Sequence, residues 1–349
     1  MRGDGLSRRK RDVRPDEGRP ARAHGQGTGE GLQPGGGVSM DPITNLEQLV
    51  EQLRTAPSRR VVIAAGQDPH SLEAAARAVG EGIARITLVG DRLRIGKLCS
   101  EMSLDPDSFT IVDEPDPLRA GALAVAQVRD GQADVLMKGL IGTADYMRLI
   151  LDKDQGLLPI SRVLSHVTVA EFPVGKLEPR RLLFLADVAI IPHPDRESMI
   201  QITGYCTAAA RSFGIERPRV ALLTASEKVS GRMPATVQAD EIARMCAADE
   251  LADRIGPADV AGPISLDLAL SAEACAIKGY GGPVGGRADV LVFPNIEAGN
   301  VFYKTATRLA GARVAAVVVG AAAPCILTSR ADSEESKFLS IAMGCRLAE

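Results

Sequence analysis

Short strand-like runs alternate with helical runs through the first half of the chain, and this alternation constrains the fold more than any other feature. The expected elements, in order, are helix 46–53, strand 61–65, helix 71–79, strand 86–89, strand 109–112, helix 118–128 and strand 133–137. A capping box, Thr44-Asn45-Leu46-Glu47, is expected to begin the first helix. Strands that alternate with helices form a parallel sheet with helices on both faces. The sequence therefore predicts an α/β fold.

The pattern changes after residue 164, where two expected strands follow each other without a long helix between them. These strands, 167–172 and 182–191, are typical of an antiparallel pair. The later expected elements are helix 198–213, strand 220–224, helix 235–247, a loop at 261–267, strand 290–293, strand 313–320 and a helix from about 333. We interpret the chain as two α/β domains. Residues 40–161 with 305–349 form the first, and residues 162–304 form a second, inserted domain.

The first 39 residues differ from everything after them. They are rich in glycine and arginine, carry a basic run at residues 7–11, and contain few large apolar side chains. Such a segment buries too little surface to offset the entropy of ordering, so we predict a disordered tail. It lacks the apolar centre of a signal peptide and the amphipathic pattern of a transit peptide. Met40 is the expected natural start, which intact-mass measurement of the native protein would check.

Composition argues against several classes of function. The net charge is -3, only 3% of residues are aromatic and tryptophan is absent, so nucleic-acid binding is not expected. No uncharged apolar run is long enough to span a bilayer, and we predict a cytoplasmic protein without a membrane partner. The six cysteines form no C-x-x-C pair, so no metal site is expected. The four histidines are dispersed; His70 and His166 could serve a site, but neither has a partner at ligand spacing.

One candidate anion site lies at residues 328–332, between an expected strand end and the last helix. Ligands bind at such turns in open α/β sheets. A helix N-terminus offers unpaired N–H groups, Arg330 adds a planar fork that matches phosphate, and Ser329 adds a hydroxyl. The alternative is an ordinary capped helix with a solvated arginine.

A second candidate follows the expected strand 133–137. Lys138 supplies a cation, Gly139 lets the backbone approach a ligand, and Thr143 is expected to cap the next helix, which carries Arg148. The pattern does not match a P-loop. The alternative is an ordinary turn that glycine makes sterically possible, with a lysine on the surface.

A third candidate follows the strand 290–293. Gly299-Asn300 is expected to open a helix that carries Tyr303 and Lys304. Asn300 can donate an amide hydrogen, and Lys304, one turn further on, lies on the same face. An ordinary helix start is the alternative.

Together these turns resemble those of the phosphate acetyl/butyryltransferases. The matching stretches are residues 136–145, 226–229, 233–236, 262–265, 294–304 and 328–332, so the resemblance covers nearly the whole chain after the tail. The Lys138-Gly139 form of the first turn and the Ser-Arg-Ala-Asp form of the last are similar to the butyryl branch rather than the acetyl branch.

The resemblance implies reversible transfer of a short acyl group between coenzyme A and inorganic phosphate. It implies a fold like that of isocitrate and isopropylmalate dehydrogenases, an active site in the interdomain cleft, a homodimer, and no organic cofactor beyond the substrate coenzyme A. By position, Ser329 matches the family's catalytic serine and Arg330 its phosphate-binding arginine. Arg148 matches an arginine that contacts substrate in the acetyl branch. Asn300, Tyr303 and Lys304 match the G-N-x-x-Y-K motif of that branch.

One position departs from the family pattern. The acetyl branch has a catalytic aspartate six residues beyond the arginine, and this chain has Ser336 there. Asp332 and Glu335 are the nearby carboxylates that can substitute, and we assign Asp332 because it stays in the turn.

Two other functions are compatible with such a fold. A metal- and NAD-dependent decarboxylating dehydrogenase needs clustered aspartates, and no such cluster is seen in the sequence. A non-catalytic module that binds acyl-CoA or acyl phosphate remains an alternative because of Ser336. Binding without turnover would distinguish that module from an enzyme.

Overall fold

The computed structural model describes residues 42–177, 181–328 and 332–348. The chain divides into two units, residues 1–40 and 41–349, and all described residues belong to the second. The expected disordered tail and Met40 lie outside the described residues, as do Ser329 and Arg330.

The helices of the described chain cover most of the sequence between the strands. They are α1 (Leu46–Thr55), α2 (Pro69–Gly80), α3 (Arg92–Glu101), the 3-10 turn η1 (Pro106–Ser108), α4 (Pro117–Arg129), α5 (Thr143–Leu151), α6 (Arg196–Ser212), α7 (Pro234–Ala247), α8 (Ala252–Ile255), α9 (Leu266–Leu270), α10 (Ala272–Lys278), α11 (Ile296–Arg308) and α12 (Glu334–Leu347).

The strands form one mixed sheet, with the order β3-β2-β1-β4-β11-β10-β5-β6-β9-β7-β8. They are β1 (Arg59–Ala64), β2 (Ala84–Gly90), β3 (Thr110–Asp113), β4 (Val135–Lys138), β5 (Ser165–Glu171), β6 (Leu182–Ala186), β7 (Arg219–Leu223), β8 (Asp259–Ile264), β9 (Val290–Val292), β10 (Arg313–Val319) and β11 (Cys325–Ile326). The predicted α/β class is confirmed, and so is the antiparallel pairing of β5 with β6. Strand β10 is antiparallel to both of its neighbours, β11 and β5.

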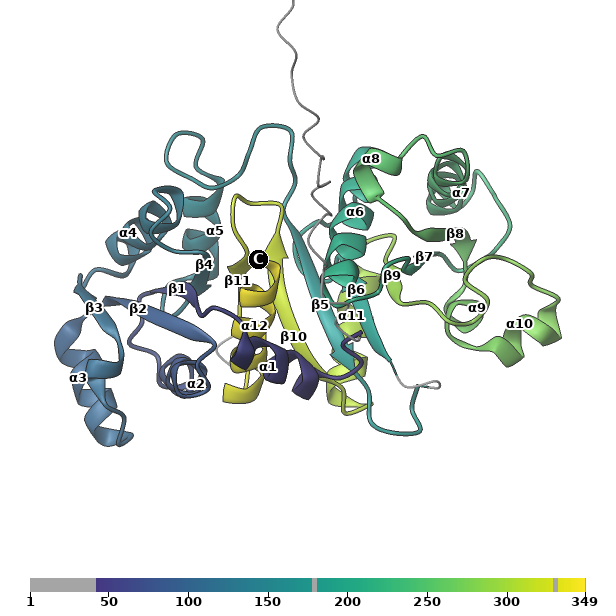
Figure 1. Ribbon diagram of the computed structural model, residues 1–349. Coiled ribbons are helices and arrows are strands. Elements are labelled where there is room, and N and C mark those ends of the chain that lie inside the picture. The colour runs from purple at the N-terminus through teal and green to yellow at the C-terminus, as the bar shows by residue number, and fades with distance from the viewer. Residues whose placement is uncertain (1–41, 178–180, 329–331, 349) are drawn as a thin grey trace, which may run out of the picture. The chain divides into compact units, whose positions relative to one another are not determined.

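Apolar side chains alternate along the strands between the two faces of the sheet. One face carries a continuous core beneath α1, α2, α6, α7 and α12. The other face carries two separate clusters, one with α4 and α5 and one with α9, α10 and α11. Figure 1 shows α4 and α5 on the opposite side of the first strands from α2.

The proposed division into two domains stays a prediction.

Three local expectations were wrong. The loop expected at 261–267 is largely strand β8: Pro263 suggested a loop, but β8 lies at the edge of the sheet, where a missing N–H is tolerated. The cap of α1 is Asn45 rather than Thr44, because its side chain accepts from the Gln48 N–H. The strand before the last turn is the two-residue β11 rather than the longer β10.

Candidate functional site

Lys138 ends β4 and is buried, with its Nζ 3.2 Å from the Gly139 carbonyl oxygen. The Gly139 N–H donates to the Ala64 carbonyl, and the Leu140 N–H donates to the Ala65 carbonyl, at 2.8 and 2.7 Å. A Cβ at Gly139 would collide with the Ala65 carbonyl oxygen. Glycine is therefore required here by the close approach to the end of β1.

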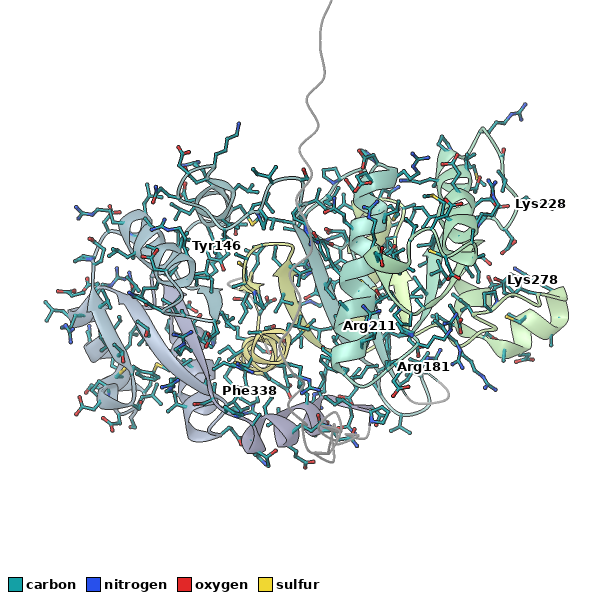
Figure 2. The ribbon with its side chains drawn as sticks, turned by 45° about the horizontal axis from the view of Figure 1, so that its top comes forward. Tyr146, Arg181, Arg211, Lys228, Lys278 and Phe338 are labelled. Atoms are coloured by element: carbon teal, nitrogen blue, oxygen red, sulfur yellow. The ribbon has the colours of Figure 1, made fainter. Side chains whose placement is uncertain are left out.

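Tyr146, which no sequence motif marks, joins the two strands that lead into the candidate turns. Its buried hydroxyl lies 3.3 Å from the Leu136 carbonyl oxygen on β4 and 3.2 Å from that of Ile326 on β11. Burial raises the pKa of Tyr146 well above its usual value, so the hydroxyl stays a donor. Figure 2 shows Tyr146 and the α12 residue Phe338 on opposite sides of the sheet. The carboxyl ends of β4 and β11 are thereby held side by side.

Helix α5 begins differently from the prediction. Its N-cap is Gly142, without a side-chain cap, and Thr143 is the first helical residue and exposed. Arg148 lies in the last turn, 70% exposed, with Nη1 3.0 Å from an Asp145 carboxylate oxygen. A role for Arg148 with substrate stays a prediction.

Asp332 is the first described residue after the Ser329 and Arg330 positions, and Ser333 is the N-cap of α12. The Ser333 hydroxyl accepts from the Ser336 N–H at 3.3 Å and donates to the Ser336 hydroxyl at 3.2 Å. Ser336 therefore takes part in the helix cap, where a hydroxyl suits the backbone geometry.

Glu335 is already bound to another part of the chain. Its Oε1 accepts from Arg313 Nε at 3.1 Å and Nη2 at 2.9 Å. Arg313 also pairs with Glu47 and Glu171, so this network ties α12 to α1 and β5. Of the two carboxylates that the sequence left open, Glu335 is thus held by Arg313, and the role of Asp332 stays a prediction.

Helix α11 begins at Ile296 with Asn295 as its cap, so the prediction that Gly299-Asn300 opens the helix was wrong. The Asn295 side chain accepts from the Ala298 N–H, which satisfies the first turn. One amide hydrogen of Asn300 is donated to the Val188 carbonyl at 3.0 Å. Asn300 is thereby fixed to the turn that follows β6, and its second amide hydrogen is compatible with the donor role expected for it.

Tyr303 and Asp332 lie close enough to interact electrostatically. Burial raises the pKa of Tyr303 to about 12, and the negative charge of Asp332 acts in the same direction. The Lys304 ammonium lies 5.4 Å from the centroid of the Tyr303 ring. The structure thus brings α11 and the start of α12 together, as the candidate site requires.

His166 and Asp187 join the same region from β5 and from the end of β6. The Asp187 carboxylate accepts the His166 N–H at 3.2 Å and the N–H groups of Ala189 and Ile190 at 2.7 and 2.8 Å. Asp187 was not predicted from the sequence, because no local pattern marks it. The signal available was an aspartate directly after an apolar run, which is where sites form in α/β sheets.

Replacing Gly299 by alanine is expected to lower the free energy of unfolding by about 1–3 kcal/mol, as overpacking does. A Cβ there would collide with the Asp187 carbonyl oxygen and lie 3.2 Å from the Val188 Cα, so α11 must shift. Chemical denaturation measures the loss. Gly96→Ala in α3 is the control, because apart from its chain neighbours and its own helix backbone no heavy atom of the described chain lies within 4 Å of its Cβ position. Equal effects of the two changes would contradict the packing argument.

A family model described as phosphate acetyl/butaryl transferase matches residues 44–121 and 117–345. The chain belongs to the phosphate acetyl/butaryl transferase family. It is 38% identical over 306 residues to the phosphate butyryltransferase of Clostridium acetobutylicum, covering 88% of this chain and 99% of that protein. It is 37% identical to the phosphate acetyltransferase of Thermotoga maritima, covering 87% of this chain and 99% of that protein.

Solved structures of related proteins match the fold. A branched-chain phosphotransacylase from Enterococcus faecalis V583 is 33% identical, with a TM-score of 0.71 over 83% of this chain and 99% of that one. A phosphotransacetylase from Streptococcus pyogenes is 23% identical, with a TM-score of 0.73 over 87% of this chain and 99% of that one. The α/β fold with a mixed sheet is therefore that of the phosphotransacylase structures.

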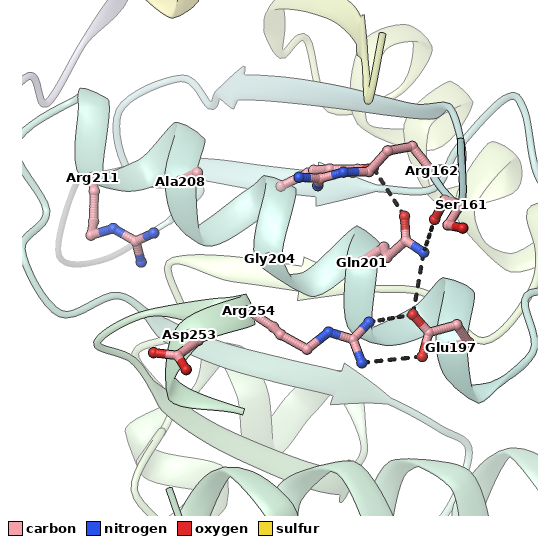
Figure 3. Close-up of a pocket in the computed structure, with 10 residues that line it drawn as sticks. Ser161, Arg162, Glu197, Gln201, Gly204, Ala208, Arg211, Asp253 and Arg254 are labelled. Carbon is pink, nitrogen blue, oxygen red and sulfur yellow. Dashed lines mark hydrogen bonds and ion pairs between the residues drawn. The ribbon is translucent and has the colours of Figure 1, made fainter. Parts of the chain in front are cut away.

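A pocket of about 420 Å³ lies on α6 and α8, away from the residues predicted for the family site. Figure 3 shows Arg254 from α8 paired with Glu197 of α6, with Gln201 beside them. None of the described site residues predicted from the sequence lines this pocket. Helix α6 packs into the core on the face opposite the two separate clusters.

Among residues 42–177, 181–328 and 332–348, no group of three or more His, Cys, Asp or Glu side chains is placed to hold a metal ion. Within the same ranges, no helix has the length and apolarity needed to cross a membrane.

Proposed function

We propose that this chain transfers a butanoyl group reversibly between coenzyme A and inorganic phosphate, with acetyl as the alternative acyl group. The observation that carries the proposal is the family match across residues 44–345, together with 38% identity to a phosphate butyryltransferase over nearly all of that protein. The electrostatic proximity of Tyr303 and Asp332, two residues of the matching motifs, supports it. Coenzyme A is a substrate here, and no further cofactor is proposed.

The reaction begins with loss of the proton from the coenzyme A thiol, whose pKa is ordinarily about 8.5. The thiolate attacks the carbonyl carbon of the acyl phosphate and forms the C–S bond. Negative charge then develops on the carbonyl oxygen, where Ser329 and the Asn300 amide are the proposed donors. The C–O bond to phosphate breaks, and Arg330, with Arg148 or Lys138, holds the departing phosphate. Asp332 is proposed to assist the transfer of this proton.

The remaining proposed features concern architecture. We propose that residues 40–161 with 305–349 and residues 162–304 form two domains, related in fold to isocitrate and isopropylmalate dehydrogenases, with the site in the cleft between them. The separation of two apolar clusters on one face of the sheet supports this. Gly139, Thr143, Tyr303 and Lys304 are assigned to substrate binding. We also propose a cytoplasmic homodimer, and light scattering at several protein concentrations tests the dimer.

Thiol release from acyl-CoAs of increasing length, acetyl to hexanoyl, tests the function. We expect release that depends on phosphate and peaks at butanoyl-CoA. A peak at acetyl-CoA would keep the mechanism and correct the substrate. Binding of acyl-CoA without phosphate-dependent release from any of them would overturn the enzyme and favour a binding module, the alternative raised by Ser336.

A further inference from the structure

His166 lies on the sheet face that carries two separate apolar clusters, between them. Along β10, Val318 belongs to the cluster with α4 and α5, and Val314 belongs to the cluster with α9 to α11. His166 pairs in register with Val318, and Thr168 pairs with Ala316. Both therefore lie at the boundary between the two apolar clusters. Val167 and Val169 belong to the continuous core on the other face of the sheet. Because neighbouring residues of a strand face opposite sides, His166 and Thr168 point toward the boundary between the two clusters.

The imidazole is held in one orientation by its neighbours. Its Nδ1 lies 3.2 Å from the Thr168 hydroxyl oxygen, and its ring is buried, with 6% of the residue exposed. In the tautomer that we assign, Nδ1–H donates to Thr168 and Nε2 carries the lone pair. Within the described ranges no hydrogen bond to Nε2 is formed, so no protein group there competes for its lone pair.

Two carboxylates accompany this ring. Asp187 directly follows β6 and is fixed by three backbone N–H groups, including that of His166. Asp332 precedes α12. Burial lowers the pKa of His166, while the charges of Asp187 and Asp332 raise it, and the net pKa lies below the usual value. The ring is therefore neutral at pH 7, and both carboxylates favour the imidazolium once it forms.

We propose that His166 Nε2 accepts the proton of the coenzyme A thiol during acyl transfer. This inference rests on the proposed function and deepens it. The S–H bond breaks and an N–H bond forms on Nε2. The thiolate pair makes the C–S bond, and the C–O bond breaks to release phosphate. In the reverse direction the imidazolium returns the proton to the departing thiolate. Asp332 then stabilises the imidazolium rather than taking the proton itself.

Relative basicity favours the ring over a carboxylate. An unperturbed imidazole has a pKa of about 6.5, against about 3.9 for aspartate and about 8.5 for a thiol. General bases work best when their pKa approaches that of the proton donor and the working pH. As in the hydrolytic triads, one ring nitrogen orients the imidazole and the other takes the proton, but here the orienting partner is the Thr168 hydroxyl rather than a carboxylate.

His166→Gln tests the inference, because the amide keeps a polar group near the Nε2 position but cannot accept the proton. We expect kcat for acyl phosphate and coenzyme A to fall by about 10²-fold or more, with KM little changed. His70→Gln is the matched control: this histidine is exposed on α2, pairs with Glu73 at 3.4 Å, and should leave kcat unchanged. A kcat for His166→Gln within threefold of wild type would overturn the inference.

The pH profile gives a readout that a structural role would not change. In the wild type, kcat should fall as pH drops below the His166 pKa, because a protonated ring cannot accept a proton. That limb should disappear in His166→Gln. The other titratable groups near the ring are Asp187 and Asp332, with Cys206 close to Asp187 and Tyr303 close to Asp332. An unchanged acid limb in the variant would assign it to one of these groups and contradict the proposal.

Thr168→Val provides a second test if His166→Gln does not fold. Valine keeps the shape of threonine but removes the oxygen that orients Nδ1, so kcat should fall about tenfold and the acid limb should shift. An unchanged kcat and limb would overturn the proposed role. Wild-type protein without phosphate-dependent thiol release would instead defeat the proposed function, which separates the two failures.

Discussion

Replacing Lys337 by methionine should lower the free energy of unfolding by about 3–5 kcal/mol, the usual cost of leaving one member of a buried ion pair without its partner. Lys337 lies in the first turn of α12, and its side chain is 3% exposed. Its Nζ lies 2.6 Å from an Asp68 carboxylate oxygen and 3.2 Å from the Ser71 hydroxyl at the start of α2. Methionine fills a similar volume but leaves the Asp68 charge with weaker compensation.

Urea denaturation measures this loss, and two further variants make it specific. Lys97→Met removes an exposed pair with Glu101, at 3.7 Å, and should cost under about 1 kcal/mol. Adding Asp68→Asn to Lys337→Met removes the carboxylate charge that has lost its partner. The double variant should therefore recover part of the lost unfolding free energy. Equal effects of Lys337→Met and Lys97→Met would contradict the buried-pair argument.

The same pair gives the stability a pH dependence of known sign. Burial raises the pKa of Asp68, but the bonds from Lys337 and Ser71 outweigh it, so the net pKa is lowered. A carboxyl group with a lowered folded pKa stabilises the protein above its unfolded pKa, about 3.9, and loses that effect as pH falls. The difference in unfolding free energy between wild type and Lys337→Met should therefore be larger at pH 7 than at pH 3. A difference that does not vary with pH would contradict this.

Replacing Arg330 by glutamine is expected to lower kcat/KM by about 10²–10³-fold, the usual effect of removing one donor that stabilises developing charge. The proposed role of Arg330 is to bind phosphate through its planar fork. Arg330→Lys keeps the charge but loses the planar fork, so the activity of this variant should lie between that of the wild type and that of Arg330→Gln. The loss should appear in both kcat and the KM for phosphate.

Initial rates at several phosphate concentrations measure the effect of Arg330. Arg94→Gln is the control, because this arginine is exposed on α3 and far along the chain from the site motifs. Activity of Arg330→Gln within threefold of wild type would remove Arg330 from the proposed site.

Local patterns were a good guide to the elements but a poor guide to their ends. Apolar periodicity predicted most of the longer helices and most strands, because burial on one face leaves a repeat in the sequence, but helix α3 was not predicted. Strand β8 was taken for a loop because of Pro263, and the start of α11 was placed several residues late because Gly299 suggested a turn. Gly299 is instead required by the backbone of Asp187, a contact across 112 residues of sequence.

Some residues of the candidate site were predictable from local sequence, and others were not. Lys138, Asn300, Tyr303, Lys304 and Asp332 were selected from strand-to-helix turns, and the structure places Tyr303 and Asp332 within electrostatic reach of each other. Asp187 was not found, and His166 had no visible partner. Their pairing depends on the antiparallel register of β5 and β6, which brings together residues that no local spacing relates.

By itself, the sequence determined the α/β class, the order of most elements and the family, because each depends on local periodicity or on motifs read in order. Tertiary structure decided which side chains meet. Glu335 and Asp332 are three residues apart, yet Arg313 binds the first, while the second acts on His166 and Tyr303. The reason is physical: local sequence sets which face of an element a residue occupies, whereas strand register and helix packing set what that face contacts.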